Sequence, residues 1–316
     1  MSYNVYSHQK EELLKKEIIP QTKKNDFSDF WEKEVEELRR IPLTVKREKL
    51  STPYDSSFLT YKISYNTHDD TVVNAYFSCP VNKKAEKLPC VARYHGGGGK
   101  KRIYHDILAT GVCCFAIDVR SQGGTTIDKG KYSLGDTNGG FMSRDVTSKD
   151  SFYMKNIYLD AVRAIDVISS FEEVDSSKIV TFGESQGGAL SIVAAALSGK
   201  VKKSFPAVTS YCCLEERVFL GSGVFDSTRK FLNKYPHYTD EVMDTLSYFD
   251  INNMVSLLKV PVSFLLGLND PICLPQFVYS AYSHVNSPKE IIISPFTVHE
   301  ISDEYQNYVH GEFAKL

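Results

Sequence analysis

The sequence lacks the features that mark membrane proteins and nucleic-acid-binding proteins. No apolar run approaches the roughly 18 residues of a membrane span, and the first residues lack the basic start and apolar core of a signal peptide. The formal net charge is only -2 at pH 7, so no excess of either sign attracts nucleic acid or an anionic lipid surface. We therefore expect neither a membrane nor a nucleic acid as a partner.

Paired metal-binding cysteines are also absent. The 7 cysteines are an odd number and contain no Cys-x-x-Cys spacing, so no zinc or redox motif is predicted. Several lie in apolar runs such as residues 112–116, which is typical of buried thiols. Buried thiols suit a reducing compartment, so we expect a cytoplasmic protein that uses no metal and no other cofactor.

Apolar strand-like segments alternate with helical segments along most of the chain. Strands are predicted at residues 58–64, 71–77, 88–94, 111–119, 178–182, 208–212, 262–266 and 290–293. Helices are predicted at residues 156–171 and 189–197. This alternation indicates an α/β fold with a mostly parallel central sheet and helices on both faces. We expect a single domain over residues 1–316.

Two segments fall outside this alternation. Residues 1–44 are charged and mostly helical in pattern, so we expect an N-terminal helical arm that packs on the main body. Its apolar face is predicted to consist of Phe30, Trp31, Val35 and Leu38. Residues 215–255 are irregular and rich in aromatic residues. We expect them to form a helical insertion over the active-site end of the sheet.

A G-x-S-x-G motif at residues 183–187 carries the strongest chemical signal. Ser185 lies between a buried strand and a helix of small residues, the context of a nucleophile elbow. Glycines are needed around such a strained turn because larger side chains would clash with neighbouring backbone. The helix that follows directs its N-terminal dipole at a developing oxyanion. A tight turn without catalysis is the alternative, and the flanking strand and helix favour the elbow.

A serine nucleophile needs a histidine base that a carboxylate orients. In this fold the acid and then the base follow the serine in the chain. Asp270 directly follows a predicted strand, and His299 follows the last one, whereas His237, His284 and His310 have no strand-end setting. Asp270 could instead cap a turn before the next proline. We predict Asp270 as the acid and His299 as the base.

An oxyanion hole in this fold takes one donor from the backbone N–H after the nucleophile, here Gln186. The second donor comes from the loop that begins at Tyr94. Either the N–H of Tyr94 or the N–H groups of Gly96 and Gly97 fit this role, and the residues alone do not choose. No Gly-Lys-Ser/Thr follows the glycine run, which excludes a phosphate loop. We expect His95 to be structural.

Three motifs together resemble the acetyl xylan esterase / cephalosporin-C deacetylase family, the seventh family of carbohydrate esterases, within the α/β-hydrolase superfamily. The family pattern is R-G-Q, then G-x-S-Q-G-G, then H-E. It is matched at residues 120–122, 183–188 and 299–300, and the likeness runs from about Asp26 to the C-terminus. The resemblance implies an α/β-hydrolase fold.

The resemblance also implies residue roles. By position, Ser185 is the nucleophile, Asp270 the acid and His299 the base. The N–H groups of Tyr94 and Gln186 become the oxyanion donors, which favours Tyr94 over the glycines.

Residues around these positions are expected to shape the site. Arg120 and Gln122 match the R-G-Q motif and should brace the active-site loops. Tyr211 is predicted to line the substrate pocket, with a buried core aromatic as the alternative. Two departures from the family affect substrate preference: Ser121 replaces the motif glycine, and Gly97 replaces an aromatic residue.

The function implied is a serine esterase that removes acetyl groups from acetylated sugars or xylo-oligosaccharides, and from cephalosporin C, through an acetyl-enzyme intermediate. The expected partner is a small acetylated carbohydrate or a related ester, and the family implies a homo-oligomer, a hexamer. A broader short-chain carboxylesterase and a non-catalytic α/β-hydrolase binding module are the alternatives.

Overall fold

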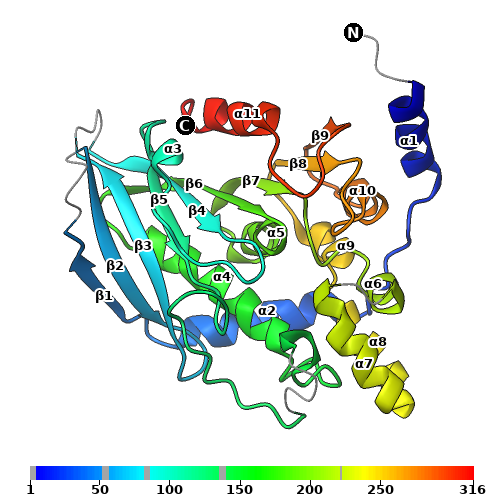
Figure 1. The fold of residues 1–316 in the computed structure, drawn as a ribbon. Helices are drawn as coiled ribbons and strands as arrows, with labels where there is room; N and C mark the ends of the chain where they lie inside the picture. Colours follow the sequence, from blue (N-terminus) through cyan, green and yellow to red (C-terminus); the bar gives the residue numbers. More distant parts are fainter. Residues whose placement is uncertain (1–4, 52–56, 82–85, 135–139, 221–222) are drawn as a thin grey trace.

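The computed structural model describes residues 5–51, 57–81, 86–134, 140–220 and 223–316. Within these residues nine strands form one sheet in the order β1-β2-β3-β5-β4-β6-β7-β8-β9. The pairs β1–β2, β2–β3 and β3–β5 are antiparallel, and every pair from β5 to β9 is parallel. Helices cover both faces of the sheet (Figure 1). The predicted α/β-hydrolase fold with a mostly parallel sheet is confirmed.

The strands follow the apolar segments of the sequence. The antiparallel part contains β1 (Val45–Lys49), β2 (Phe58–Asn66) and β3 (Val72–Pro80). The parallel part contains β4 (Leu88–Tyr94), β5 (Cys113–Ile117), β6 (Val174–Glu184), β7 (Val201–Ala207), β8 (Val262–Gly267) and β9 (Lys289–Ser294). Strands β5 and β8 are buried along their whole length, as expected for parallel strands covered on both faces.

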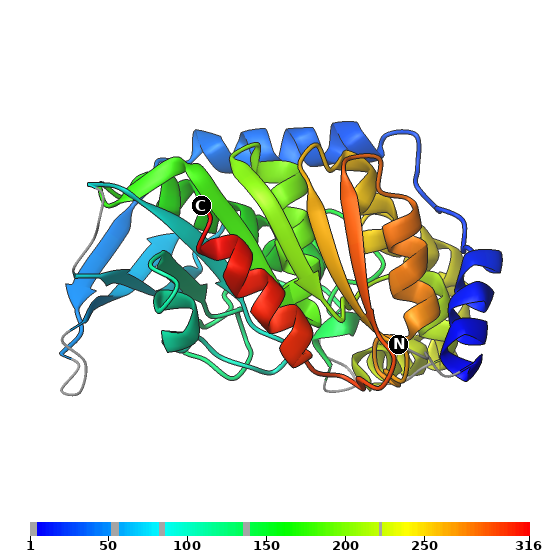
Figure 2. The same ribbon diagram turned by 90° about the horizontal axis from the view of Figure 1, so that it is seen from above.

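Two layers of helices bury the two faces of this sheet. The larger apolar cluster contains α2 (Phe27–Arg40), α4 (Tyr153–Ser169), α5 (Gln186–Ser198), α9 (Ile251–Met254) and α10 (Pro275–Ser283). The smaller cluster, on the opposite face, contains α3 (His105–Leu108) and α11 (Asp303–Phe313). Figure 2 shows α11 lying across the strands on this face. None of the described helices combines the length and the apolar composition needed to cross a membrane.

The N-terminal arm contains α1 (Val5–Lys16) and α2. The four residues of its predicted apolar face, Phe30, Trp31, Val35 and Leu38, are all buried. The indole Nε1 of Trp31 donates a hydrogen bond to the carbonyl of Tyr248, 2.9 Å away. Helix α1 lies beside α10 (Figure 1). The arm therefore packs on the main body by burying one apolar stripe.

The segment predicted as an insertion is helical. It contains α6 (Leu214–Leu220), η2 (Gly223–Phe225), α7 (Asp226–Lys234), η3 (Pro236–Tyr238) and α8 (Thr239–Ser247) before α9 and η4 (Val255–Leu257). The buried Asp250 accepts the backbone N–H groups of Cys213 and Leu214, at 2.9 and 2.7 Å. One carboxylate thus joins the two ends of this helical segment.

One predicted strand is wrong. Residues 208–212 are not extended, because Val208 and Tyr211 have positive φ angles of 39° and 62°. The strand in this part of the chain is β7, which ends just before residue 208. Its lysines and its proline interrupt the apolar pattern, so the pattern did not predict it. Lys203 in β7 faces α11 and forms a salt bridge with Glu312, at 2.9 Å.

Candidate active site

Ser185 occupies a strained turn between β6 and α5. Its φ and ψ are 55° and -120°, a backbone conformation that residues other than glycine rarely adopt. A Cβ at Gly183 would lie 2.3 Å from the carbonyl of Gly187, and a Cβ at Gly187 would lie 2.1 Å from the carbonyl oxygen of Tyr94. Only glycine fits at either place. The G-x-S-x-G sequence therefore folds as a nucleophile elbow for a steric reason.

Asp270 and His299 come together because they follow neighbouring parallel strands. Asp270 lies after β8 and His299 after β9, and such loops meet at one edge of the sheet. The Nδ1 of His299 is 2.8 Å from Oδ2 of Asp270. The other carboxylate oxygen accepts the backbone N–H groups of Ile272 and Cys273, both at 2.8 Å. Asp270 is thus held in place on both sides while it orients the imidazole ring.

The pKa of His299 is raised to about 10. The largest cause is its hydrogen bond to Asp270, and the second is its interaction with the thiol of Cys273. The predicted competitors make other contacts. The Nε2 of His284 bonds to the carbonyl of Ile19, His310 lies 3.4 Å from Asp106, and His237 packs on the ring of Tyr238. Glu300, next to the predicted base, accepts the N–H of Val298 at 3.2 Å.

Cys273 is a member of the site that the sequence analysis missed. Its Sγ lies 4.0 Å from Oγ of Ser185, and its interaction with His299 contributes to the raised pKa of that histidine. The described contacts of the Ser185 hydroxyl include this thiol and not the imidazole. Catalytic hydrogen bonds are often long in an unliganded site and tighten around substrate. The only sequence signal was the position of Cys273, three residues after Asp270.

The predicted oxyanion donors flank the elbow. Tyr94 ends β4 beside Gly183 of β6 in the parallel register. Its ring is buried, and its hydroxyl donates to the carbonyl of Ala161 at 2.9 Å, so the ring points into the core. Gln186 is the first residue of α5, where backbone N–H groups have no helical partner.

His95 is held by the backbone on both ring nitrogens. Its Nε2 accepts the N–H of Val119 at 3.0 Å, so its Nδ1 carries the proton and donates to the carbonyl of Gly96, 2.7 Å away. Burial lowers the pKa of His95, which favours this neutral form. The ring shapes the glycine loop and is not available as a base.

Gln122 connects the glycine loop to the elbow. Its amide exchanges two hydrogen bonds with the amide of Gln186, and its Oε1 also accepts the N–H of Gly98 at 2.9 Å. Tyr211 donates its hydroxyl to Oε1 of Gln186 at 2.8 Å. The ring of Tyr211 is buried and packs edge-on against Phe225. The side chain of Gln186 is therefore held by two partners.

Arg120 anchors the chain next to Gln122. Its guanidinium is fully buried and pairs with Asp160 through two hydrogen bonds of 2.7 Å. It also bonds to Asp69 at 2.6 Å and to Asp128 at 3.1 Å. Tyr153 donates to its backbone carbonyl at 2.6 Å. Such a cluster fixes the chain just before Gln122.

Ser121, the departure from the family motif, lies in the left-handed region with φ of 56°. A glycine adopts this angle without strain, whereas a serine does so at a cost. Its backbone N–H donates to the carbonyl of Thr126, 3.0 Å away, which closes the loop. The turn is kept although its residue is unfavourable there.

Arg217 in α6 is a second residue that the sequence analysis missed. It is 4% exposed, and its Nη1 is buried without a hydrogen-bond partner among the described residues. The guanidinium packs over the ring of Phe225, 4.8 Å from its centroid. Burial lowers the pKa of Arg217. Electrostatic interactions with Cys273 and Asp270 act in the opposite direction and raise it. Helix α6 thus carries a buried cation whose charge interacts with Asp270 and Cys273.

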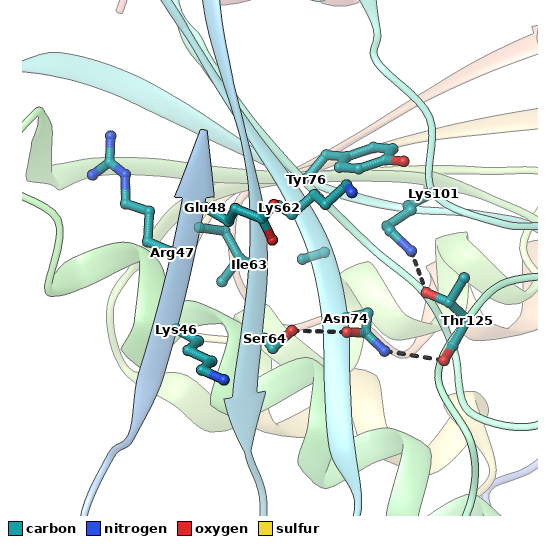
Figure 3. A pocket seen from close by; sticks show the side chains of 11 residues that line it. Lys46, Arg47, Glu48, Lys62, Ile63, Ser64, Asn74, Tyr76, Lys101 and Thr125 are labelled. Atoms are coloured by element: carbon teal, nitrogen blue, oxygen red, sulfur yellow. Dashed lines mark hydrogen bonds between the residues drawn. The ribbon is translucent and has the colours of Figure 1, made fainter. Parts of the chain in front are cut away.

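A separate cavity of about 450 Å³ lies on the face of β1, β2 and β3 (Figure 3). Cross-strand neighbours Ser64 and Asn74 hydrogen-bond to each other at its floor. Lys101 closes it on one side, where its ammonium lies 5.1 Å from the ring centroid of Tyr76. No residue of the predicted triad lines this cavity. It does not belong to the elbow site.

Comparisons with known proteins agree with this architecture. A family model described as acetyl xylan esterase (AXE1) matches residues 11–315. The structure of the acetyl xylan esterase from Paenibacillus sp. R4 is 30% identical and superimposes with a TM-score of 0.90, covering 96% of this chain and 98% of that one. That of acetyl xylan esterase 1 from Thermoanaerobacterium sp. JW/SL YS485 is 24% identical, with a TM-score of 0.89 and coverage of 100% and 99%.

A curated relative is longer. The acetyl esterase Axe7A of Xylanibacter ruminicola is 29% identical over 309 residues, which cover 93% of this chain and 66% of Axe7A. The chain therefore spans about two thirds of the length of that relative.

The fold and these likenesses define the class: the chain is a carboxylic ester hydrolase with an α/β-hydrolase fold. Since the family model matches nearly every residue, the chain belongs to the acetyl xylan esterase family.

Proposed function

We propose that this protein removes acetyl groups from acetylated sugars or xylo-oligosaccharides through a Ser185–His299–Asp270 triad. The observation that carries the proposal is the 2.8 Å contact between His299 and a doubly anchored Asp270, at the sheet edge where the elbow presents Ser185. This arrangement supplies a nucleophile, a base and an orienting acid. The matched family supports acetyl esters of sugars as the substrate class.

The reaction follows in two steps. Oγ of Ser185 attacks the acetyl carbonyl while His299 takes its proton, and the Asp270 carboxylate stabilises the imidazolium. The N–H groups of Tyr94 and Gln186 donate to the oxyanion, each worth on the order of 3 kcal/mol of transition-state stabilisation. The sugar alcohol leaves with the proton from His299. Water then cleaves the acetyl-enzyme by the same route.

The substrate pocket is proposed to include Tyr211. Its hydroxyl contacts the side chain of Gln186, so it borders the residue whose N–H is the proposed oxyanion donor. A hexamer, a cytoplasmic location and activity on cephalosporin C are further parts of the proposal that rest on family resemblance. Gel filtration with light scattering tests the hexamer, and a monomer would contradict it.

The decisive experiment is the Ser185→Ala variant with p-nitrophenyl acetate as substrate. We expect hydrolysis to fall to background while circular dichroism and the melting temperature stay close to wild type. A retained wild-type rate would show that Ser185 is not the nucleophile. Acetate release from acetylated xylo-oligosaccharides, simple sugar acetates and cephalosporin C then ranks the leaving alcohols.

Two measurements separate the alternatives. Rates on acetyl, butyryl and octanoyl nitrophenyl esters should fall steeply with chain length, whereas a broader carboxylesterase would keep the longer esters. A fluorophosphonate probe should label Ser185. An unlabelled serine would favour a non-catalytic binding module.

A further inference from the structure

The turn after β8 places a thiol beside the proposed catalytic acid. Asp270 accepts the backbone N–H of Cys273 at 2.8 Å, so residues 270–273 form a tight turn. Across from this turn lies His299. One ligand atom each from Asp270, Cys273 and His299 lie within 4.8 Å of one another. Among the described residues, these three side chains form the group whose spacing suits a metal ion.

The three donors are a carboxylate oxygen, a sulfur and an imidazole nitrogen. Zn²⁺ binds all three types, at about 2.0–2.3 Å, and prefers four ligands in a tetrahedron. Ligand atoms around such an ion lie about 3.5 Å apart, so donors that lie within 4.8 Å of one another need only small shifts to bind it. The hydroxyl of Ser185 lies 4.0 Å from the sulfur.

We propose that Asp270, Cys273 and His299 form an inhibitory site for a borderline-soft divalent cation such as Zn²⁺. The inhibition, though not the binding, rests on the proposed function of His299 as the base. A coordination bond to His299 occupies the nitrogen lone pair that would accept the serine proton, or replaces the hydrogen bond that orients the ring. Either change removes the base. The Cys273 thiol gives up its proton to solvent as the metal–sulfur bond forms.

The expected affinity for the metal ion depends on how an ion reaches the three ligands and on the charges around them. Asp270 and Cys273 are buried, whereas the side chain of His299 is 22% exposed, so an ion enters past the imidazole. The positive charge of the buried Arg217 interacts with Asp270 and Cys273. The same positive charge opposes a second cation. We therefore expect a dissociation constant on the order of micromolar, weaker than that of a structural zinc site.

The test uses the reduced full-length protein with added metal. Co²⁺ serves as the spectroscopic probe, because a cobalt–thiolate bond produces a charge-transfer band in the near ultraviolet. Zn²⁺ serves as the inhibitor of p-nitrophenyl acetate hydrolysis, with each variant referred to its own metal-free rate. The variants are Cys273→Ala and, as a matched control, Cys114→Ala, a buried thiol in β5 outside the group.

We expect the cobalt band in wild type and in Cys114→Ala and its absence in Cys273→Ala. Zn²⁺ should inhibit wild type reversibly, with a chelator restoring the rate, and should inhibit Cys273→Ala at least about tenfold more weakly. No band in wild type, or equal zinc sensitivity of wild type and Cys273→Ala, would overturn the proposal. A wild type that binds Co²⁺ but hydrolyses no ester would instead refute the proposed function.

Discussion

Gln122 and Gln186 exchange two hydrogen bonds through their side-chain amides. The Nε2 of Gln122 donates to Gln186 at 2.7 Å, and the return bond is 3.0 Å long. The same Gln122 oxygen accepts the N–H of Gly98. One side chain from the R-x-Q motif thus fixes both the residue after Ser185 and the glycine loop.

Replacing Gln122 with alanine should lower kcat by about 10- to 100-fold, because the buried amide of Gln186 loses a partner and its backbone N–H loses its fixed position. The KM for p-nitrophenyl acetate should change little, since Gln122 is expected to act through Gln186 and not on the ester. Initial-rate kinetics measure kcat and KM separately. A rise in KM at unchanged kcat would indicate a role in binding instead.

The rate of ester hydrolysis should rise with pH from neutral toward alkaline conditions. The pKa of His299 is raised to about 10, chiefly by its hydrogen bond to Asp270, so the neutral imidazole that accepts a proton becomes more abundant as pH increases. A profile of kcat/KM against pH measures this directly.

The Asp270→Asn variant tests the cause of the raised pKa. Without the carboxylate, the pKa of His299 should fall toward about 6.5, and the rising limb should move to lower pH. Its plateau rate should be roughly 10³- to 10⁴-fold lower, since the ring is no longer oriented. If the rising limb of the pH profile did not move in Asp270→Asn, its position would report the pKa of a group other than His299.

Ser121→Gly should stabilise the protein by about 0.5–1 kcal/mol, because glycine adopts φ of 56° without strain and this gain exceeds its extra unfolded-state entropy. Ser121→Val should destabilise it, since a β-branched residue tolerates this angle poorly. Urea denaturation measures both. Equal stability of the three proteins would show that the turn relaxes.

Arg120→Met should lower the free energy of unfolding by about 3–5 kcal/mol, because three carboxylates would be left around an uncharged side chain. Asp128→Asn, which removes one negative charge of the cluster and keeps an oxygen that can accept a hydrogen bond, serves as the milder control. Denaturant melts compare the two. If Arg120→Met cost no more than Asp128→Asn, the cluster would not be what holds the loop.

Several elements of the fold were predictable from local patterns. The strand at residues 88–94 is β4, and the apolar face of the arm is buried as periodicity indicated. The pattern failed at β7, since lysines that reach a helix on one face and a proline break the apolar run. Helix α11 and strand β1 were not predicted, because their polar residues resemble those of a loop.

For the site, chain order and motif spacing singled out Ser185, Asp270 and His299, because strand-end loops of a parallel sheet meet at one edge. Sequence also marked Ser121 as unusual. Only the tertiary structure decided what surrounds these residues. A turn brings the thiol of Cys273 to 4.0 Å from Oγ of Ser185, and the buried charge of Arg217 in α6 interacts with Asp270, and no spacing rule links these residues to the elbow. Local periodicity therefore determined the elements, and long-range packing determined the chemistry around them.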